Sequence, residues 1–486
     1  MNGTWRYGAL LVAISGCGTE HPPVATASEL VATLADAEAG DTIRVDSGRF
    51  EGEFVVPAGV ELRGSGRGST FLVGVEGGKV LTIDAGEGET TIRDLTIETG
   101  VRATDEIGED TDDDGRLEFE TEQAEVGVYA VASADLLVER VDLEVATGQG
   151  IWAEGLTSVR FYEVSVSGRV NRDNATRWGW DEYQLALESA PMNGVVVRDA
   201  AVARLDLVDA SGFAQAAVVL DANADTRWTG GRVCDNLGTS VLVAAGTTAL
   251  ESIQICNMLE GFGLVPPYGL AVVAEAEVTT TGLVIEGSLA GESIGMLQHA
   301  SRSVHTGVTI VNNRGIGVLV QASHGTADAP SFALLPDQPN DLSRNAFVGL
   351  ALFEATGVRI ANTTIDATAT LPMIQGDLAG VEVGDGIQIR RCLSGDCANE
   401  MTDIRLDSVT LRSNGRAALV IEAQNAAADG IVCGTVDVGD VGEFGAVVQN
   451  QTVDPQNWDS IAERGAPRDL ETVQGVDPEF LPGVGG

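Results

Sequence analysis

The chain has 486 residues, with 72 Asp and Glu against 29 Lys and Arg, so its formal net charge at pH 7 is −43. A charge of this size repels phosphates, which argues against nucleic acid as a partner. Apolar residues make up 44% of the chain, aromatic residues only 5%, and 60 residues are glycine. This composition excludes wholesale disorder and favours many short strands and tight turns over a helical bundle.

The first residues have the pattern of an export signal. Arg6 supplies a positive charge, and the apolar stretch 8–14 is too short to span a bilayer as a helix. The stretch ends in Ile14-Ser15-Gly16-Cys17, which resembles the lipobox of bacterial lipoproteins. The resemblance implies that 1–16 is a signal peptide removed before Cys17, and that a lipid on Cys17 anchors the chain to the membrane. An ordinary signal peptide with a chance cysteine is the alternative.

The residues after the cysteine bear on localisation. Gly18, and not Asp, follows Cys17, which in Gram-negative lipoproteins implies the outer membrane, so we expect an exported protein at the outer membrane or cell surface. Residues 17–27 are expected to form a short tether. No later run of 18 apolar residues exists, so no transmembrane helix is expected.

Residues 28–37 are predicted to form a short helix. Ser28 can act as its N-cap, and Leu30, Val31 and Leu34 form one apolar face over a single turn.

Short runs of alternating apolar residues recur along the rest of the chain, 22 to 24 residues apart where they are closest. A unit of this size with two or three period-2 strands is typical of a solenoid, whereas a propeller blade needs about 40 residues. One unit has too little apolar surface to fold alone, and stacking buries a continuous column of Val, Ile, Leu and Ala. The sequence therefore predicts an all-β solenoid of about a dozen coils.

Residues 28–64 resemble the start of right-handed parallel β-helix proteins of the pectin-lyase-like superfamily. In those proteins a short helix precedes a Gly-Asp-Thr-Ile-x-Val strand, here Gly40–Val45, and a strand ending in Leu-Arg-Gly, here Val60–Gly64. The resemblance implies that the helix caps the open N-terminal end of the column. The tail at 475–480 also resembles the closing segment of that family. We therefore expect 28–486 to be one right-handed parallel β-helix domain.

Insertions into a solenoid often cluster on its binding face. The sequence predicts four of them, at 101–125, 168–183, 325–345 and 371–403.

The insertion 101–125 contains three aspartates at alternate positions followed by Gly115, which matches the start of a calcium loop. The predicted ligands of a structural Ca²⁺ are Asp110, Asp112, Asp114, the carbonyl of Arg116, and Glu118. The twelfth position is Thr121, where an EF-hand has a bidentate Glu, and no flanking helices are evident. The alternative is a solvated acidic loop.

The insertion 168–183 concentrates aromatic and basic residues in a chain poor in aromatics. Exposed Trp and Tyr can stack on sugar rings, and Arg can pair with uronate carboxylates. The predicted ligand-binding residues are Arg177, Trp178, Trp180 and Tyr183. The alternative is a loop that folds back, so that its Trp residues cover the side of the solenoid.

Enzymes of the resembled superfamily cut or de-esterify uronate polymers, but none of their characteristic aspartate or histidine motifs stands out here. The weak catalytic candidates are Asp206, Asp209, Asp221, Arg204 and Arg227, which lie near consecutive turns and could form a carboxylate–arginine patch. The alternative is ordinary surface charge. The histidines show no metal-ligand spacing, and His299 and His305 are expected at turns or on the surface.

Export permits disulfides. Cys234 and Cys256 are 22 residues apart in matching contexts, and equivalent positions on adjacent coils lie about 4.8 Å apart, within reach of a bridge. Two stacked buried thiols are the alternative. Cys392 and Cys397 are predicted to close their own loop, which leaves Cys433 unpaired and buried.

The expected function is non-catalytic binding of a surface glycan or a protein partner through loops on one face. A polysaccharide lyase or glycoside hydrolase acting on an acidic polysaccharide is the alternative, and a structural surface protein without a ligand is a third possibility.

Overall fold

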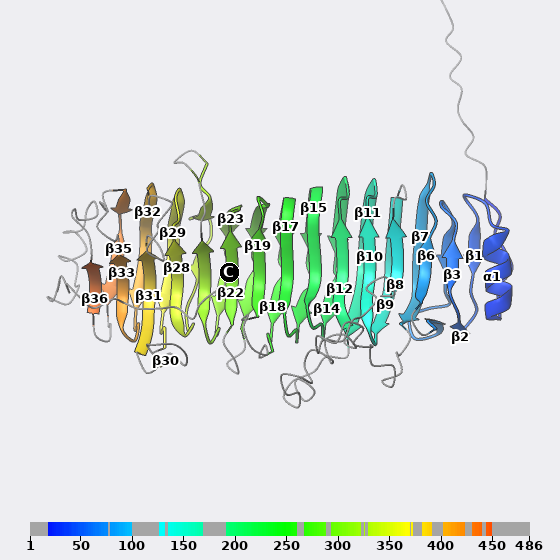
Figure 1. The fold of residues 1–486 in the computed structure, drawn as a ribbon, viewed down its shortest axis with the longest axis horizontal. Helices are drawn as coiled ribbons and strands as arrows, with labels where there is room; N and C mark the ends of the chain where they lie inside the picture. The colour runs from blue at the N-terminus through cyan, green and yellow to red at the C-terminus, as the bar shows by residue number, and fades with distance from the viewer. Residues whose placement is uncertain are drawn as a thin grey trace, which may run out of the picture.

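In the computed structural model the chain winds into a stack of coils, each built from short strands at three faces (Figure 1). Strands of successive coils pair in parallel and form three long ladders. This confirms the predicted all-β parallel β-helix. The described residues are 18–75, 78–99, 126–131, 135–168, 191–259, 267–287, 293–321, 325, 329–369, 371–372, 382–390, 402–422, 430–439 and 444–449.

The first ladder carries the candidate site described below. Its strands, in order along the stack, are β3 (Phe54–Val56), β6 (Lys79–Ile83), β8 (Val126–Val131), β10 (Gly148–Glu154), β12 (Pro191–Arg198), the first part of β15 (Ala216–Thr229), the first part of β17 (Thr239–Glu251), β19 (Tyr268–Val273), β22 (Ile294–His299), β25 (Ile316–Gln321), β28 (Phe347–Phe353), β31 (Glu382–Arg390), β33 (Ala417–Glu422) and β36 (Phe444–Gln449).

The second ladder follows the first in each coil. It comprises β1 (Thr42–Arg44), β4 (Glu61–Arg63), the first parts of β7 (Glu89–Glu98), β9 (Asp135–Val145) and β11 (Ser158–Gly168), β13 (Val202–Asp206), the last parts of β15 and β17, β20 (Glu277–Thr281), β23 (Arg302–Thr306), β26 (Phe332–Leu334), the first parts of β29 (Val358–Asp366) and β32 (Ile404–Arg412), and β34 (Ile431–Cys433).

The third ladder completes each coil. It comprises β2 (Gly48–Glu51), β5 (Thr70–Val73), the last parts of β7, β9 and β11, β14 (Asp209–Ser211), β16 (Arg232–Cys234), β18 (Gln254–Cys256), β21 (Val284–Glu286), β24 (Thr309–Val311), β27 (Asn340–Asp341), the last parts of β29 and β32, and β35 (Val436–Gly439). One short strand, β30 (Leu371–Pro372), instead pairs antiparallel with β31.

The core is a column of aliphatic side chains stacked in register. In the first ladder, Ile151, Val195, Val218, Val241 and Leu270 pair in succession and are all fully buried. Because successive side chains of a strand point to opposite faces, every second residue enters the column and the others face outward.

The corner between the second and third ladders repeats one backbone conformation. A left-handed residue stands there in successive coils, at Asp94, Arg140, Glu163 and Leu207, with φ of 57°, 51°, 52° and 55°. Residues other than glycine rarely adopt this backbone conformation, so packing against the neighbouring coils must stabilise it. Buried asparagines at other corners bond the adjacent coil: the Oδ1 atoms of Asn223 and Asn236 accept from the backbone N–H groups of Ala200 at 2.9 Å and Phe213 at 3.0 Å.

The helix α1 (Ala27–Ala35) lies at the N-terminal end of the stack (Figure 1). Its N-cap is Thr26, whose hydroxyl accepts from the N–H of Glu29 at 3.2 Å, while the Glu29 carboxylate accepts from the N–H of Thr26 at 3.1 Å. The prediction of Ser28 as N-cap is therefore wrong, because Thr26 forms the reciprocal capping box with Glu29.

The apolar face of α1 is narrower than predicted. Leu30 and Leu34 are buried, but Val31 is 49% exposed. Residues four apart share one side of a helix, whereas consecutive residues do not, so Val31 points away from the column.

Residues 18–25 run along β1. The N–H of His21 donates to the carbonyl of Thr42 at 3.1 Å, that of Val24 donates to Arg44 at 2.9 Å, and Val24 is buried. The stretch expected as part of a short tether thus pairs with the first coil, and its backbone covers the open edge of β1.

A polar network interrupts the aliphatic column. His305 is fully buried, with Nδ1 2.8 Å from the hydroxyl of Thr280 and Nε2 2.8 Å from that of Ser303, which in turn donates to Gln298. Burial lowers the pKa of His305 to about 3. The expectation of a turn or surface position is therefore wrong for His305, which faces inward from β23, whereas His299 at the end of β22 is exposed.

Candidate functional site

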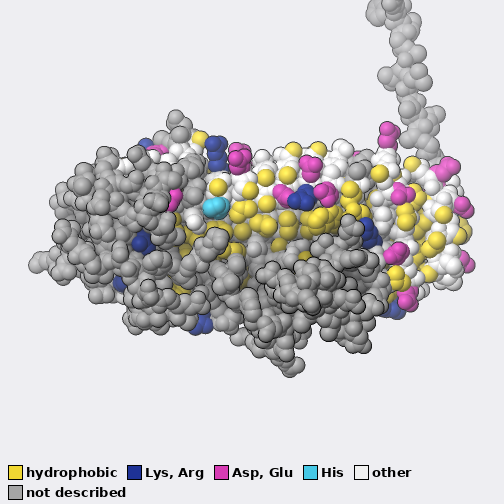
Figure 2. All heavy atoms as spheres, in the orientation of Figure 1, with side chains coloured by type: hydrophobic (Ala, Val, Ile, Leu, Met, Phe, Trp, Pro, Cys, Tyr) yellow, Lys and Arg dark blue, Asp and Glu magenta, His cyan; other side chains and the backbone are white. Residues whose placement is uncertain are grey.

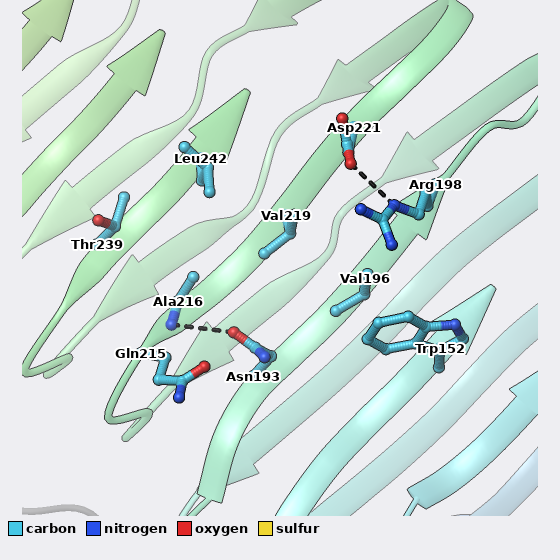
Figure 3. Close-up of a pocket in the computed structure, with 10 residues that line it drawn as sticks. All are labelled: Trp152, Asn193, Val196, Arg198, Gln215, Ala216, Val219, Asp221, Thr239 and Leu242. Atoms are coloured by element: carbon cyan, nitrogen blue, oxygen red, sulfur yellow. Dashed lines mark hydrogen bonds and ion pairs between the residues drawn. The ribbon is translucent and has the colours of Figure 1, made fainter. Parts of the chain in front are cut away.

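An open pocket of about 330 Å³ lies on the outer face of the first ladder, over β10, β12, β15 and β17 (Figure 3). Apolar side chains come from the middle of each strand, and polar side chains lie toward the strand ends. The described residues that line it are Trp152, Asn193, Val196, Arg198, Gln215, Ala216, Val219, Asp221, Thr239 and Leu242.

Two aromatic side chains lie in register beside each other on this face. Trp152 of β10 pairs with Tyr129 of β8, and both are partly exposed. Trp152 points outward because Ile151 and Ala153 on either side of it enter the column. The indole Nε1–H donates to the carboxylate of Glu154 at 2.9 Å, which holds the ring in place.

A row of charged residues lies along the C-terminal ends of the same strands. Glu154, Arg198 and Asp221 pair in register on β10, β12 and β15. The Arg198 Nε donates to Asp221 Oδ2 at 2.9 Å. This hydrogen bond and the charge of Asp221 raise the pKa of Arg198, and the charge of Glu154 adds to the effect. The pair is solvent-accessible, so it contributes at most about 1 kcal/mol to stability.

The opposite end of the pocket carries amide groups. The Oδ1 of Asn193 accepts from the N–H of Ala216 at 3.2 Å, which fixes the orientation of that side chain. Gln215 lies beside it, and the labelled side chains of Figure 3 thus place amides at one end of the pocket and the Arg198–Asp221 pair at the other, with Trp152 and Val196 between them.

Farther along the stack the same outer face is apolar. We call this cluster the outer apolar stripe. Figure 2 shows other apolar side chains that remain visible along the middle of the molecule. All ten members of the outer apolar stripe are less than one-tenth exposed, so they pack as a second small core and do not extend the open pocket. They are Tyr268, Ala271, Ile294, Leu297, Ile316, Leu319, Phe347, Val348, Ala351 and Phe353.

A buried ion pair follows the stripe on β31. Asp385 is fully buried and accepts from the Nε of Arg416 at 2.8 Å, from the N–H of Ala417 at 3.2 Å and from Gln388 at 2.5 Å. Its carboxylate oxygens are thus already occupied, which suits a structural role.

The five weak catalytic candidates do not converge. Asp221 lies in the pocket on the first ladder, Arg204, Asp206 and Arg227 lie on the second ladder, and Asp209 lies on the third. Arg204, Asp206 and Arg227 thus lie near one another on adjacent coils of the second ladder, whereas Asp221 and Asp209 lie on other ladders, so the five residues do not form one patch. The two arginines have nearby partners instead: Arg204 pairs with Asp225, and Arg227 pairs with Glu251 at 2.9 Å.

Several predicted site residues lie outside the described residues. They are the lipidation site Cys17, the calcium-loop residues Asp110, Asp112, Asp114, Arg116 and Glu118, the aromatic-loop residues Arg177, Trp178, Trp180 and Tyr183, and the pair Cys392 and Cys397. These remain predictions.

Cys234 and Cys256 occupy equivalent positions on β16 and β18, with a Cα–Cα distance of 4.6 Å, and are joined by a disulfide bond. Cys433 is a buried free thiol whose burial raises its pKa to about 12. Within the described ranges, no three or more His, Cys, Asp or Glu side chains group as metal ligands do.

The sequence reasoning missed Trp152, Tyr129 and Arg198 as site residues. A signal for Trp152 was present, because it alternates with Ile151 and Ala153 in an apolar run, and a large aromatic at the outward phase of such a strand is exposed. In the part of the chain that the structure describes, no helix is both long and apolar enough to cross a membrane.

No protein-family model matches the chain, and no curated protein is similar to it in sequence. Solved structures do match. The A-module of mannuronan C-5 epimerase AlgE4 from Azotobacter vinelandii is 15% identical, with a TM-score of 0.40 over 89% of this chain and 100% of that one.

The catalytic domain of a GH87 α-1,3-glucanase, solved with tetrasaccharides, is 13% identical, with a TM-score of 0.45 over 91% of this chain and 69% of that one. Tailspike protein 3 of bacteriophage CBA120 is 10% identical, with a TM-score of 0.37 over 90% and 57% of the two chains. Likenesses this distant carry no argument about what this chain binds.

Proposed function

We propose that this protein binds a polysaccharide across the outer face of the first ladder, over Tyr129, Trp152 and the adjoining pocket. The observation that carries the proposal is the partly exposed ring of Trp152 in the pocket, in register with Tyr129, whose own ring has the Lys79 ammonium 3.5 Å from its centre. The C–H face of a sugar ring packs on such rings, and an amphipathic aromatic side chain provides a large contact area at low entropic cost.

The polar fringe of the pocket supports the same function. Asn193 and Gln215 offer amide donors and acceptors at one end, and Arg198 and Asp221 offer charged groups at the other. A few fixed polar groups around an apolar floor are the usual means of orienting a ligand. Because equivalent positions recur on successive coils about 4.8 Å apart, an extended polymer can contact several coils at once.

Binding without cleavage is favoured by the state of the carboxylates. Glu154 accepts the indole N–H of Trp152, Asp221 accepts from Arg198, and Asp385 is buried and saturated. Each of these three carboxylates therefore already accepts a hydrogen bond from a protein group, and none is reserved for proton transfer to a ligand.

The proposal is tested by retention of residues 18–486 on a panel of polysaccharides. We expect Trp152→Ala to weaken retention about tenfold or more, since the variant loses the aromatic ring on which a sugar would stack. Tyr162→Ala is the matched control, because Tyr162 is 41% exposed on the second ladder, away from the pocket. Equal losses in both variants, or no loss in Trp152→Ala, would contradict the assignment of the site.

Glycoside hydrolysis is the second candidate, and one observation favours it. Glu154 and Asp221 flank Arg198 in the same row, two coils apart, which is about 10 Å along the stack. This is close to the upper end of the separation of about 6.5–9.5 Å found between the two carboxylates of inverting glycosidases. New reducing ends during incubation with a retained polymer, abolished by Glu154→Gln, would establish this activity in place of simple binding.

We also propose that the chain is exported and anchored to the outer membrane by a lipid on Cys17. The lipobox-like run Ile14-Ser15-Gly16-Cys17 supports this. Incorporation of labelled fatty acid into the wild-type chain, absent from Cys17→Ala, is the expected result. A chain released as an unmodified soluble protein would contradict it.

A further inference from the structure

The charge at the pocket bears on which polysaccharides it can accept. Arg198 is the only cation among the described residues that line it. It stands in register between Glu154 and Asp221 and is hydrogen-bonded to Asp221. The row therefore carries two negative charges to one positive charge, and the guanidinium is already engaged.

One further cation, Lys79, lies at the Tyr129 end of the binding face, with its Nζ 3.5 Å from the centre of the Tyr129 ring. Its strand β6 is three coils away from β12, so Lys79 does not reach the charged row at Arg198. The whole chain carries a net charge of −43, so the field around the pocket is negative.

A polyuronate carries one carboxylate on each sugar. Bound here, each carboxylate would have to find a cation or lose its hydration beside Glu154 and Asp221, which is unfavourable. Hydroxyl groups meet no such penalty, because Asn193, Gln215 and the charged row all offer them hydrogen bonds.

We infer, on the basis of the proposed function, that the polysaccharide bound over Trp152 is uncharged and not a polyuronate. This departs from the acidic polysaccharide expected for an enzyme of the resembled superfamily. The net negative charge of the row Glu154, Arg198 and Asp221 favours binding of neutral polymers over anionic ones.

The test is affinity electrophoresis of residues 18–486 in gels that contain neutral polymers (hydroxyethylcellulose, β-1,3-glucan, dextran, galactomannan) or polyuronates (polygalacturonate, alginate), each with Ca²⁺ and with EDTA. Retardation of the wild-type chain is taken as binding at the pocket only where Trp152→Ala abolishes it. Asp221→Asn releases Arg198 from its partner, and the expected result is a gain of about tenfold in retention on a polyuronate, because the guanidinium can then pair with a uronate.

Glu251→Gln is the matched control. It frees Arg227 from a similar exposed pair at 2.9 Å, but on the second ladder. Retention of the wild-type chain by a neutral polymer alone, with a polyuronate gain in Asp221→Asn and none in Glu251→Gln, would support the inference. Thermal melts of both variants establish that they are folded.

Two results overturn the inference and leave the proposed function standing. One is Trp152-dependent retention of the wild-type chain on a polyuronate; the other is equal polyuronate gain, or no gain, in Asp221→Asn and Glu251→Gln. Failure of every polymer to retain the wild-type chain overturns the proposed function, and the inference falls with it.

Discussion

His305 is the one histidine that the structure encloses completely among the described residues, and it has no carboxylate partner there. Its neighbours are the hydroxyls of Thr280 and Ser303 and the ring of Phe332, whose centre is 5.1 Å away. A protonated imidazole at this position would be a buried charge without a counter-charge, which is why the pKa falls to about 3 from its ordinary value of 6.5.

This burial predicts a pH dependence of stability. Between pH 6.5 and about 3 the unfolded chain binds a proton at His305 and the folded chain does not. The free energy of unfolding is therefore unaffected by the titration of His305 above pH 6.5 and falls as the pH drops through this range. The slope is about 1.4 kcal/mol per pH unit. The free energy of unfolding of His305→Gln, measured by denaturant titration, should therefore fall about 2 kcal/mol less between pH 7 and pH 5 than that of the wild type. An identical fall in both proteins would contradict the assignment of a neutral buried imidazole.

At the scale of residues, sequence patterns predicted the inward side chains better than the outward ones. The alternation in 126–131 identifies Val128 and Ala130 as core because every second apolar residue must enter the column. It does not say which outward residues meet, since that depends on how coils stack. Arg198 and Asp221 are 23 positions apart in the chain, and only the register between β12 and β15 brings them together.

The N-cap of helix α1 can be tested directly by mutation. Thr26→Ala removes one half of the capping box and should lower the free energy of unfolding of the terminal coil by about 1 kcal/mol. Ser28→Ala should change it by a few tenths of a kcal/mol, because Ser28 lies inside the first turn and its exposed hydroxyl contacts that of Thr26 at 3.3 Å, while Thr26 is the N-cap. Hydrogen exchange of the amides in β1 reports the local change. The opposite ranking of the two variants would restore Ser28 as the functional cap.

The strands of the first ladder were the most predictable elements. The apolar runs at 126–131, 216–220 and 269–273 fall within β8, β15 and β19. The strands β9 and β11 were harder, because each runs unbroken through the corner between two ladders with a left-handed residue, Arg140 or Glu163. Neither residue type favours that conformation, so a sequence pattern alone does not locate the corner.

At the scale of the whole molecule, the net charge of −43 opposes folding through self-repulsion. Any salt relieves part of this repulsion, so a specific calcium site must be separated from simple screening. Millimolar CaCl₂ should raise the melting temperature by a few degrees more than NaCl of equal ionic strength. The double variant Asp112→Asn/Asp114→Asn should respond to both salts alike. An equal response of the wild type to the two salts would leave 110–118 as a solvated acidic loop.

Each inner strand of the three ladders bonds to the strand one coil before it and the strand one coil after it, while the corners carry the segments that vary in length. A change at one corner therefore leaves the pairing of every other coil as it was. Single coils can therefore be duplicated, deleted or lengthened during evolution without compensating changes in the rest of the solenoid. Each such change can alter the surface that the protein offers to a ligand.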